Sequence, residues 1–349
     1  MTVMFARSLL AFVVAAWAAT CGPLSASAAS FTDAAGRVVD VPDDVKRIMP
    51  AGPPAAVLLY ALAPGKMAGW VRPFSADEKA FLAAPWRDLP VTGRLTGKEG
   101  DADAETVKKV KPDLIVDVGT VSPEYAELAD RIQKETGVPY VLIDGSLAKT
   151  PETLRALGAM LGETDNAEAL AKYAESALAR TQAAVAEQPA DGKLLVYYGR
   201  GKDGLETGGA GSINTEFLGT VGAKNVAEGE GKGGLTKVTI DQIAAWKPYV
   251  ILTLDATFQQ AALTDPAWSA VTAAKEKRVY RAPALPFGWI DSPPGVNRLI
   301  GLDWLVATLY PQQAKIDLKQ QARDFYHLFY HVDLSDEQLS TLLDGTSAK

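Results

Sequence analysis

The sequence has almost no cysteine and almost no histidine. Its 349 residues include one cysteine, Cys21, and two histidines, His327 and His331. A single cysteine forms no internal disulfide and builds no thiolate cluster. Because imidazole and thiolate are the usual ligands of zinc and similar ions, we expect no site for a bare transition metal. The two histidines have the i, i+4 spacing of a zinc pair, but the apolar residues of FYHLFYHV around them indicate a packing helix.

Long apolar runs are also missing, because no stretch reaches the roughly 18 residues that span a bilayer. The apolar run at residues 9–19 follows Arg7 and precedes Ala26-Ser27-Ala28. This order of charge, short apolar run and small residues is typical of a cleaved secretory signal, which we place at residues 1–28. Cys21 could instead accept a lipid, but Ala-Ala-Thr before it is a poor lipidation motif.

Positive charge is scarce relative to negative charge. The net charge is −7, and removal of the leader, whose only charged residue is Arg7, makes it −8. An acidic surface disfavours nucleic acid and anionic membranes as partners. We therefore expect a freely diffusing exported protein that binds no nucleic acid.

Motifs of common enzymes are largely absent. The sequence contains no G-x-S-x-G elbow and no Walker lysine. GRGKDG at residues 199–204 matches G-x-G-x-x-G, but LETGGAG follows it where a dinucleotide site requires a helix. We expect no enzyme, and a periplasmic α/β enzyme that modifies an organic ligand is the alternative from a different class.

Apolar strands alternate with helical patterns in two parts of the chain, which indicates an α/β fold with parallel sheets. We predict one Rossmann-like lobe at residues 29–150 and a second at 189–349. Residues 151–188 lack strand signals and predict one long linking helix, with a possible interruption near Gly162. The predicted fold is therefore two α/β lobes joined by a long helix, with a ligand cleft between them.

One sequence pattern occurs twice, and we call it the repeated αβ unit. ETVKKVKPDLIVDV at residues 105–118 returns as DQIAAWKPYVILTL at 241–254, a constant shift of 136 residues. Each copy starts with an acid, Glu105 or Asp241, in the first turn of a helix, where the helix dipole favours a carboxylate. Lys-Pro ends the helix and an apolar run predicts a buried parallel strand. The acids are thus explained either as parts of an αβ unit or as functional groups.

Several segments together resemble one family. They are the leader, FTDAAGRVVDVPDDVKRIM, DAETVKKVKPDLIVDVG, TPETLRALGAMLG, VTIDQIAAWKPYVILT and RVYRAPALPFGWIDSPP. Across the mature chain they resemble the substrate-binding proteins of ABC importers whose lobes are joined by a single long helix. The chain is most similar to the iron–siderophore, haem and cobalamin branch. That resemblance implies that Glu105 and Asp241, one per lobe, dock onto arginines of the permease.

Candidate ligand residues lie where predicted strands end, because open α/β sheets bind ligands beyond the carboxyl ends of their strands. Aromatic walls and bidentate arginine grips are expected there. The candidate walls are Trp70, Tyr198, Phe287 and Trp289, and the candidate grips are Arg72, Arg94 and Arg200. Each of these residues could also be an ordinary core ring or a solvated charge.

The sequence thus predicts a periplasmic solute-binding protein. We expect it to capture a metal chelate, foremost an iron–siderophore complex, and to deliver it to an ABC permease dimer in the inner membrane. An oxyanion such as molybdate or tungstate is the alternative ligand. We expect a monomer with no built-in cofactor, in which any metal arrives as part of the bound ligand.

Overall fold

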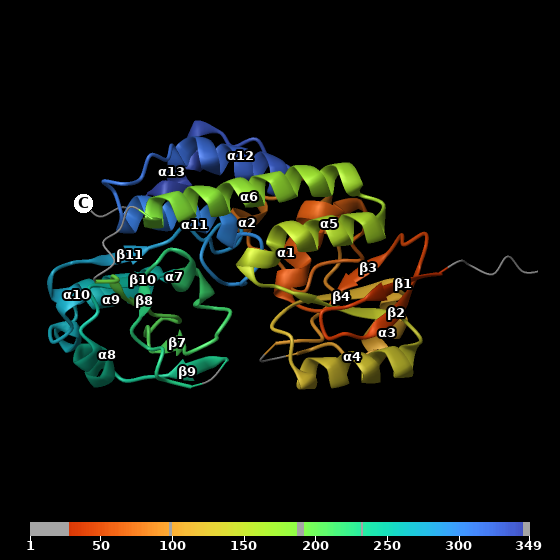
Figure 1. Ribbon diagram of the computed structural model, residues 1–349, viewed down its shortest axis with the longest axis horizontal. Coiled ribbons are helices and arrows are strands. Elements are labelled where there is room, and N and C mark those ends of the chain that lie inside the picture. Colours follow the sequence, from red (N-terminus) through yellow and green to blue (C-terminus); the bar gives the residue numbers. More distant parts are fainter. Residues whose placement is uncertain (1–27, 98–99, 187–191, 232, 345–349) are drawn as a thin grey trace, which may run out of the picture.

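The computed structural model describes residues 28–97, 100–186, 192–231 and 233–344. The predicted leader, apart from Ala28, and Cys21 lie outside these residues. Figure 1 shows two lobes, each with its own sheet, and a long helix that runs across both. In the part of the chain so described, no helix combines the length and apolar character needed to cross a membrane.

The first lobe contains a three-stranded parallel sheet in the order β3 (Ile48–Pro50), β4 (Leu114–Gly119), β5 (Tyr140–Asp144). An antiparallel hairpin of β1 (Ala28–Thr32) and β2 (Val38–Pro42) precedes it. Its helices are α1 (Pro53–Leu62), α2 (Ala76–Lys79), α3 (Ala104–Val110) and α4 (Pro123–Thr136). The segments KMAGWVR (residues 66–72) and LPVTGR (residues 89–94) form only single bridges, Ile48 to Met67 and Trp70 to Val91.

The second lobe contains a parallel sheet in the order β11 (Val279–Arg281), β10 (Val250–Thr253), β6 (Leu195–Tyr198), β8 (Lys224–Asn225). A separate antiparallel pair joins β7 (Glu206–Gly208) to β9 (Leu235–Lys237). The helices of this part are α7 (Glu216–Thr220), α8 (Ile240–Trp246), α9 (Ala256–Thr264), α10 (Thr272–Lys275), α11 (Arg298–Leu309), α12 (Leu318–Tyr330) and α13 (Asp336–Leu343). Short 3-10 turns lie at Pro64–Lys66, Trp86–Asp88, Leu147–Lys149 and Pro266–Trp268.

The linking segment forms two helices instead of one. α5 (Thr150–Leu161) ends at Gly162, which has the left-handed conformation (φ 71°), and α6 (Thr164–Ala186) begins just after it. The two helices pack so closely that a Cβ on Gly158 would lie 2.2 Å from that of Ala167. The possible break near Gly162 is thus present, and α6 alone is the connection. Its 23 residues correspond to about 35 Å of stiff helix.

The C-terminal helices lie across both lobes. The hydroxyl of Tyr60 on α1 donates to the carbonyl of Tyr330 on α12 at 2.6 Å. Gln338 on α13 donates to the carbonyl of Ala80 in the first lobe at 2.9 Å. Ser335 caps α13, and the reciprocal side chain of its capping box is Gln338. A single apolar cluster includes residues of α1, α6, α11 and α12. This shared core ties the lobes together at their α6 side.

Candidate functional site

A cavity of about 730 Å³ lies between the lobes. The first lobe contributes residues that follow β4 and β5, at the carboxyl ends of the strands, as the topology of parallel sheets requires. The second lobe contributes a glycine-rich loop, the start of α7 and the segment around β8. The lining residues are Gly119, Thr120, Val121, Asp144, Ser146, Lys193, Gly209, Ala210, Gly211, Ser212, Ile213, Thr215, Glu216, Gly219, Ala223, Lys224, Asn225 and Glu228.

This interlobe cavity has a mixed polar and apolar lining, with no aromatic side chain among its described lining residues. Eight of its 18 lining residues are glycine, serine or threonine, and five are charged: Asp144, Lys193, Glu216, Lys224 and Glu228. Asp144 at its edge forms an ion pair with Lys149 at 2.7 Å. Burial alone would raise the pKa of Asp144, but the hydrogen bonds from Lys149 and from the Ser146 N–H outweigh it and lower that pKa. Asp144 therefore remains ionised and paired.

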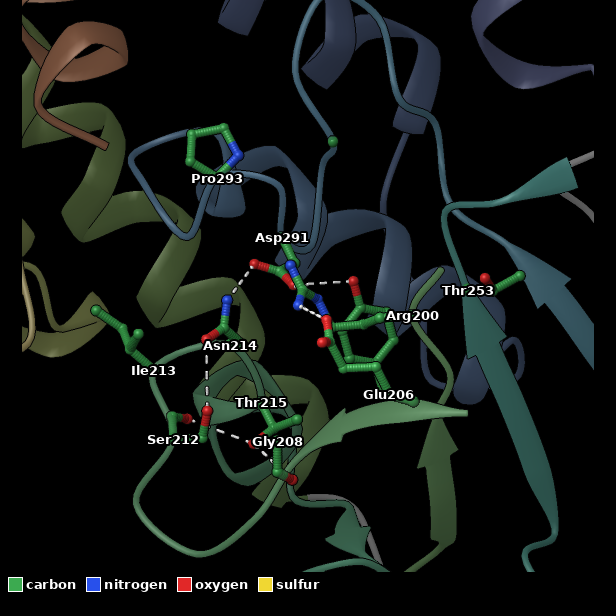
Figure 2. Close-up of polar contacts among 12 residues, drawn as sticks. Arg200, Glu206, Gly208, Ser212, Ile213, Asn214, Thr215, Thr253, Asp291 and Pro293 are labelled. Carbon is green, nitrogen blue, oxygen red and sulfur yellow. Dashed lines mark hydrogen bonds and ion pairs between the residues drawn. The ribbon is translucent and has the colours of Figure 1, made fainter. Parts of the chain in front are cut away.

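The glycine-rich loop at residues 208–215 is held in place by hydrogen bonds to its surroundings. Asn214 donates from Nδ2 to Asp291 at 2.8 Å, and Asn225 donates to the carbonyl of Gly208 at 2.8 Å. Only glycine fits at position 209, because a Cβ there would lie 1.5 Å from the carbonyl oxygen of Glu230. Figure 2 shows Asn214 directed at Asp291, with Ser212 and Thr215 on the same loop. The loop is thus preorganised before any ligand binds.

Asp291 is fully buried, and its carboxylate accepts hydrogen bonds from three side chains. It accepts from the Tyr198 hydroxyl at 3.0 Å, from Arg200 Nε at 2.7 Å and from Asn214. Arg200 also forms an ion pair with Glu206 at 2.6 Å (Figure 2). Burial raises the pKa of Tyr198 well above its ordinary value, and the carboxylate of Asp291 adds to that rise. Arg200 is therefore engaged by two carboxylates.

The predicted arginines do not converge on the interlobe cavity. Arg72 forms a bidentate pair with Glu78, at 2.6 and 3.2 Å, and lies over the ring of Phe74. Arg94 lies in the loop after residue 93, and its backbone N–H donates to the carboxylate of Asp101 at 2.8 Å. Arg200 lines a smaller cavity of about 330 Å³ together with Tyr198, Glu206 and Ser292.

The predicted aromatic walls are buried in the protein interior. Trp70, Phe287 and Trp289 are 2%, 4% and 0% exposed. Trp70 packs against Phe74 and Phe287, and Phe287 packs against Tyr330. Trp289 donates from its indole N–H to the Tyr326 hydroxyl at 3.0 Å. Tyr198 is also buried, with 1% exposed. The structure therefore gives these rings packing partners where the sequence suggested open faces.

The two copies of the repeated αβ unit, at residues 105–118 and 241–254, have the same local structure. Asp103 caps α3 and Thr239 caps α8, each through a capping box, and each helix has seven residues. Lys111 and Lys247 end the helices in the left-handed conformation, both at φ 52°. Figure 1 shows α3 and α8 in the part of each lobe far from α6.

The acids that open these helices are exposed. Glu105 lies in the first turn of α3, and its carboxylate pairs with Lys108 at 2.7 Å within the same helix. Asp241 occupies the equivalent position in α8. Because an exposed ion pair of this kind contributes little, the carboxylate of Glu105 remains accessible.

The histidines do not form a metal site. His327 pairs with Asp333 at 2.7 Å, whereas His331 ends α12 and contacts the carbonyl of Tyr60 at 3.0 Å. Among the described residues, no group of three or more potential metal ligands comes together. GRGKDG leads into the turn before β7 and not into a helix.

Comparison with known families matches residues 79–285 to the periplasmic binding protein family, which is more than half of the chain. The chain belongs to this family. Members of the family are solute-binding proteins and not enzymes, so the alternative of a periplasmic enzyme is set aside. For this periplasmic binding protein, an opening between two lobes is the expected place for a ligand.

Similar proteins include the solute-binding protein of an ABC transporter from Sulfurospirillum deleyianum. Its structure shares 28% identity, covers 90% of this chain and 98% of its own, and has a TM-score of 0.80. A periplasmic solute-binding protein from Veillonella parvula shares 26% identity over 91% of this chain and 98% of its own, with a TM-score of 0.70. These structures have the same fold over nearly the whole chain.

The molybdate-binding protein MolA of Haemophilus influenzae is 33% identical over 129 residues, which are 36% of this chain and 36% of MolA. The structure of MolA with bound molybdate covers 88% of this chain and 99% of its own at 22% identity, with a TM-score of 0.71. The aligned sequence thus spans about a third of that relative, whereas the fold is shared over most of it.

Sequence reasoning missed Glu216, Asp291 and Arg298 around the cavity. Each is an ionisable residue next to apolar or glycine-rich sequence, and burial of a charge is costly unless it is paired. An ionisable residue within apolar or glycine-rich sequence was therefore the signal that could have identified them. Arg298 in particular begins an otherwise apolar helix, RLIGLDWLVATL.

Proposed function

We propose that this protein captures a small, strongly polar anion of the molybdate type between its lobes and delivers it to an ABC permease in the inner membrane. The observation that carries the proposal is the lining of the interlobe cavity. Glycine, serine and threonine residues and two lysines, Lys193 and Lys224, line it, and aromatic side chains are absent from its described lining. Two of its three carboxylates, Asp144 and Glu216, are paired with Lys149 and Arg298.

This lining suits an oxyanion for a physical reason. A tetrahedral oxyanion presents several acceptor oxygens, and preorganised backbone N–H and hydroxyl donors satisfy them without a change of charge in the protein. Haem or a corrinoid presents a large apolar surface that requires apolar or aromatic walls. The four rings expected to form such walls are buried instead. The likeness to MolA, a molybdate-binding protein, supports the same ligand class.

A compact polar metal chelate is the second candidate, and the size of the cavity favours it. About 730 Å³ exceeds the volume of one tetrahedral oxyanion, so either the lobes approach one another on binding or the ligand is larger. In both cases the metal arrives as part of the ligand, and the protein contributes donors to the ligand's outer atoms.

Delivery to the permease rests on the exposed acids of α3 and α8. Glu105 and Asp241 present one carboxylate per lobe from structurally equivalent positions. Arginines of a permease dimer would pair with them through charge-assisted hydrogen bonds and would orient the protein. The function requires the periplasm, in agreement with the leader expected at residues 1–28.

A calorimetric titration with a cavity-blocking variant tests the ligand assignment. Sodium molybdate, sodium sulfate and a ferric hydroxamate would each be titrated into the purified protein and into Thr120→Trp, because Thr120 is exposed and lines the cavity. Thr264→Trp, the same change at an exposed position of α9, is the matched control. We expect molybdate to bind the parent and Thr264→Trp but not Thr120→Trp. Binding of the ferric chelate alone would contradict the oxyanion assignment.

A further inference from the structure

Arg298 is a buried cation at the boundary between the lobes. It is the first residue of α11 and is 1% exposed. Its guanidinium donates to the carbonyls of Gly145 at 2.6 Å, Ile213 at 3.0 Å and Gly295 at 3.2 Å, and to Glu216 Oε2 at 2.8 Å. A buried charge is tolerated only when it is paired and its donors are satisfied, and this arrangement meets both conditions.

The partners of Arg298 belong to both lobes. Gly145 follows β5 in the first lobe, whereas Ile213 and Glu216 belong to the second. Glu216 adds a further link across the boundary, because its Oε1 accepts the backbone N–H of Leu147 at 2.9 Å. We call Arg298, Glu216, Gly145, Leu147 and Ile213 the interlobe clamp.

The lobes touch at the interlobe clamp. A Cβ on Gly145 would lie 3.2 Å from Ile213 Cδ1, so the backbone of the first lobe packs directly on a side chain of the second. Asp144 and Ser146, on either side of Gly145, line the interlobe cavity, as do Ile213 and Glu216. Both walls of the cavity are therefore attached to one guanidinium group.

We propose that Arg298 is a positioning residue, which fixes the spacing of the two cavity walls and thereby sets the affinity for the ligand. The inference rests on the proposed function only in that the ligand binds in the interlobe cavity. The planar guanidinium has donors in fixed directions and can hold several acceptors at once, which a lysine ammonium on a flexible stem cannot do. Without this group, the walls would occupy a range of spacings, and the ligand would have to select the competent one.

The test compares Arg298 with a second arginine that also contacts α11. Arg180 on α6 pairs with the fully buried Asp303 on α11 at 2.7 and 3.0 Å, and neither residue lines the cavity. Arg298→Met and Arg180→Met each remove a guanidinium group that is paired with a carboxylate, in the first case at the cavity and in the second away from it. Arg298→Lys keeps the charge, and Glu216→Gln keeps an acceptor for Leu147 while it removes the carboxylate.

Two quantities would be measured. Calorimetry with sodium molybdate gives the affinity. Pulsed electron spin resonance gives the distance distribution between labels at Lys109→Cys and Ala245→Cys, which are exposed on α3 and α8. A Cys21→Ser background leaves these two as the only thiols.

We expect Arg298→Met to weaken molybdate binding about tenfold or more, because the apparent affinity falls with the fraction of molecules that have the competent spacing, and to broaden the distance distribution. Arg298→Lys should restore part of both, and Arg180→Met should change thermal stability alone. Equal loss of affinity in both methionine variants, or a parental distance distribution in Arg298→Met, would overturn the proposal.

The two proposals fail separately. If the parent chain does not bind molybdate, the oxyanion assignment is wrong, and the distance distributions still decide the role of the interlobe clamp. If Arg298→Met does not fold, Arg298→Lys and Glu216→Gln give the same comparison. Unchanged distances and affinity in both would then refute the clamp.

Discussion

Asp117 allows a quantitative prediction about stability and pH. It lies on β4, is 6% exposed, and accepts hydrogen bonds from the Tyr140 hydroxyl and from Thr96 Oγ1, both at 3.2 Å. Burial raises its pKa from 3.8 to about 6, against the opposing effect of these hydrogen bonds. The neutral carboxyl is therefore favoured in the folded protein relative to the unfolded chain.

The sign follows from proton binding. Between about pH 4 and pH 6 the folded state holds a proton on Asp117 that the unfolded state has released, so stability falls as pH rises through this range. The difference between 3.8 and about 6 corresponds to about 3 kcal/mol, at about 1.4 kcal/mol per pH unit. Roughly 2 kcal/mol of this lies between about pH 4.5 and pH 7.

Asp117→Asn removes this titration. Urea unfolding of the variant and the parent at about pH 4.5 and pH 7 should show the variant gaining about 2 kcal/mol relative to the parent over that interval. Asp88→Asn is the control, because the hydrogen bond from Lys79 lowers the pKa of the exposed Asp88 and its pH effect has the opposite sign. If the free energies of unfolding of Asp117→Asn and the parent differ by the same amount at both pH values, the reasoning is refuted.

Two further predictions concern docking and the aromatic core. Glu105→Arg combined with Asp241→Arg should abolish uptake in cells while ligand affinity is retained. Glu337→Arg, which reverses an exposed first-turn acid of α13, should leave uptake unchanged. Normal uptake in the double variant would refute the docking role. Trp70→Ala should lower the free energy of unfolding by about 3–5 kcal/mol without a change in ligand affinity, because Trp70 is a core residue. Tyr249→Ala, at a half-exposed ring, should cost under about 1 kcal/mol, and equal losses at both positions would contradict this assignment.

The features that could be predicted from the sequence are those with local causes. First-turn acids, Lys-Pro boundaries and continuous apolar runs predicted α3, β4, α8 and β10, and all four elements are present. Gly137 ends α4 in the left-handed conformation (φ 72°), which glycine adopts readily. These features depend on backbone geometry and on neighbours a few residues away, which a single sequence displays directly.

The ligand residues depend on distant contacts, and there the prediction from sequence was weaker. Position at a strand end does not tell whether a ring faces the cleft or the interior. Phe287 and Trp289 face inward because Tyr326 and Tyr330 of α12 pack against them. Arg72 is engaged because Glu78 lies six residues on, across a turn that the sequence pattern did not define. The interlobe clamp joins residues that are 69 to 153 positions apart.

The central claim is that a small polar anion occupies the cavity between the lobes. Native mass spectrometry with elemental analysis, on protein isolated from the periplasm of cells grown with molybdate, tests it most directly. We predict one added mass per chain that corresponds to molybdate, with stoichiometric molybdenum and no iron, and its loss in Thr120→Trp. An iron-containing organic adduct in the parent chain would contradict this account.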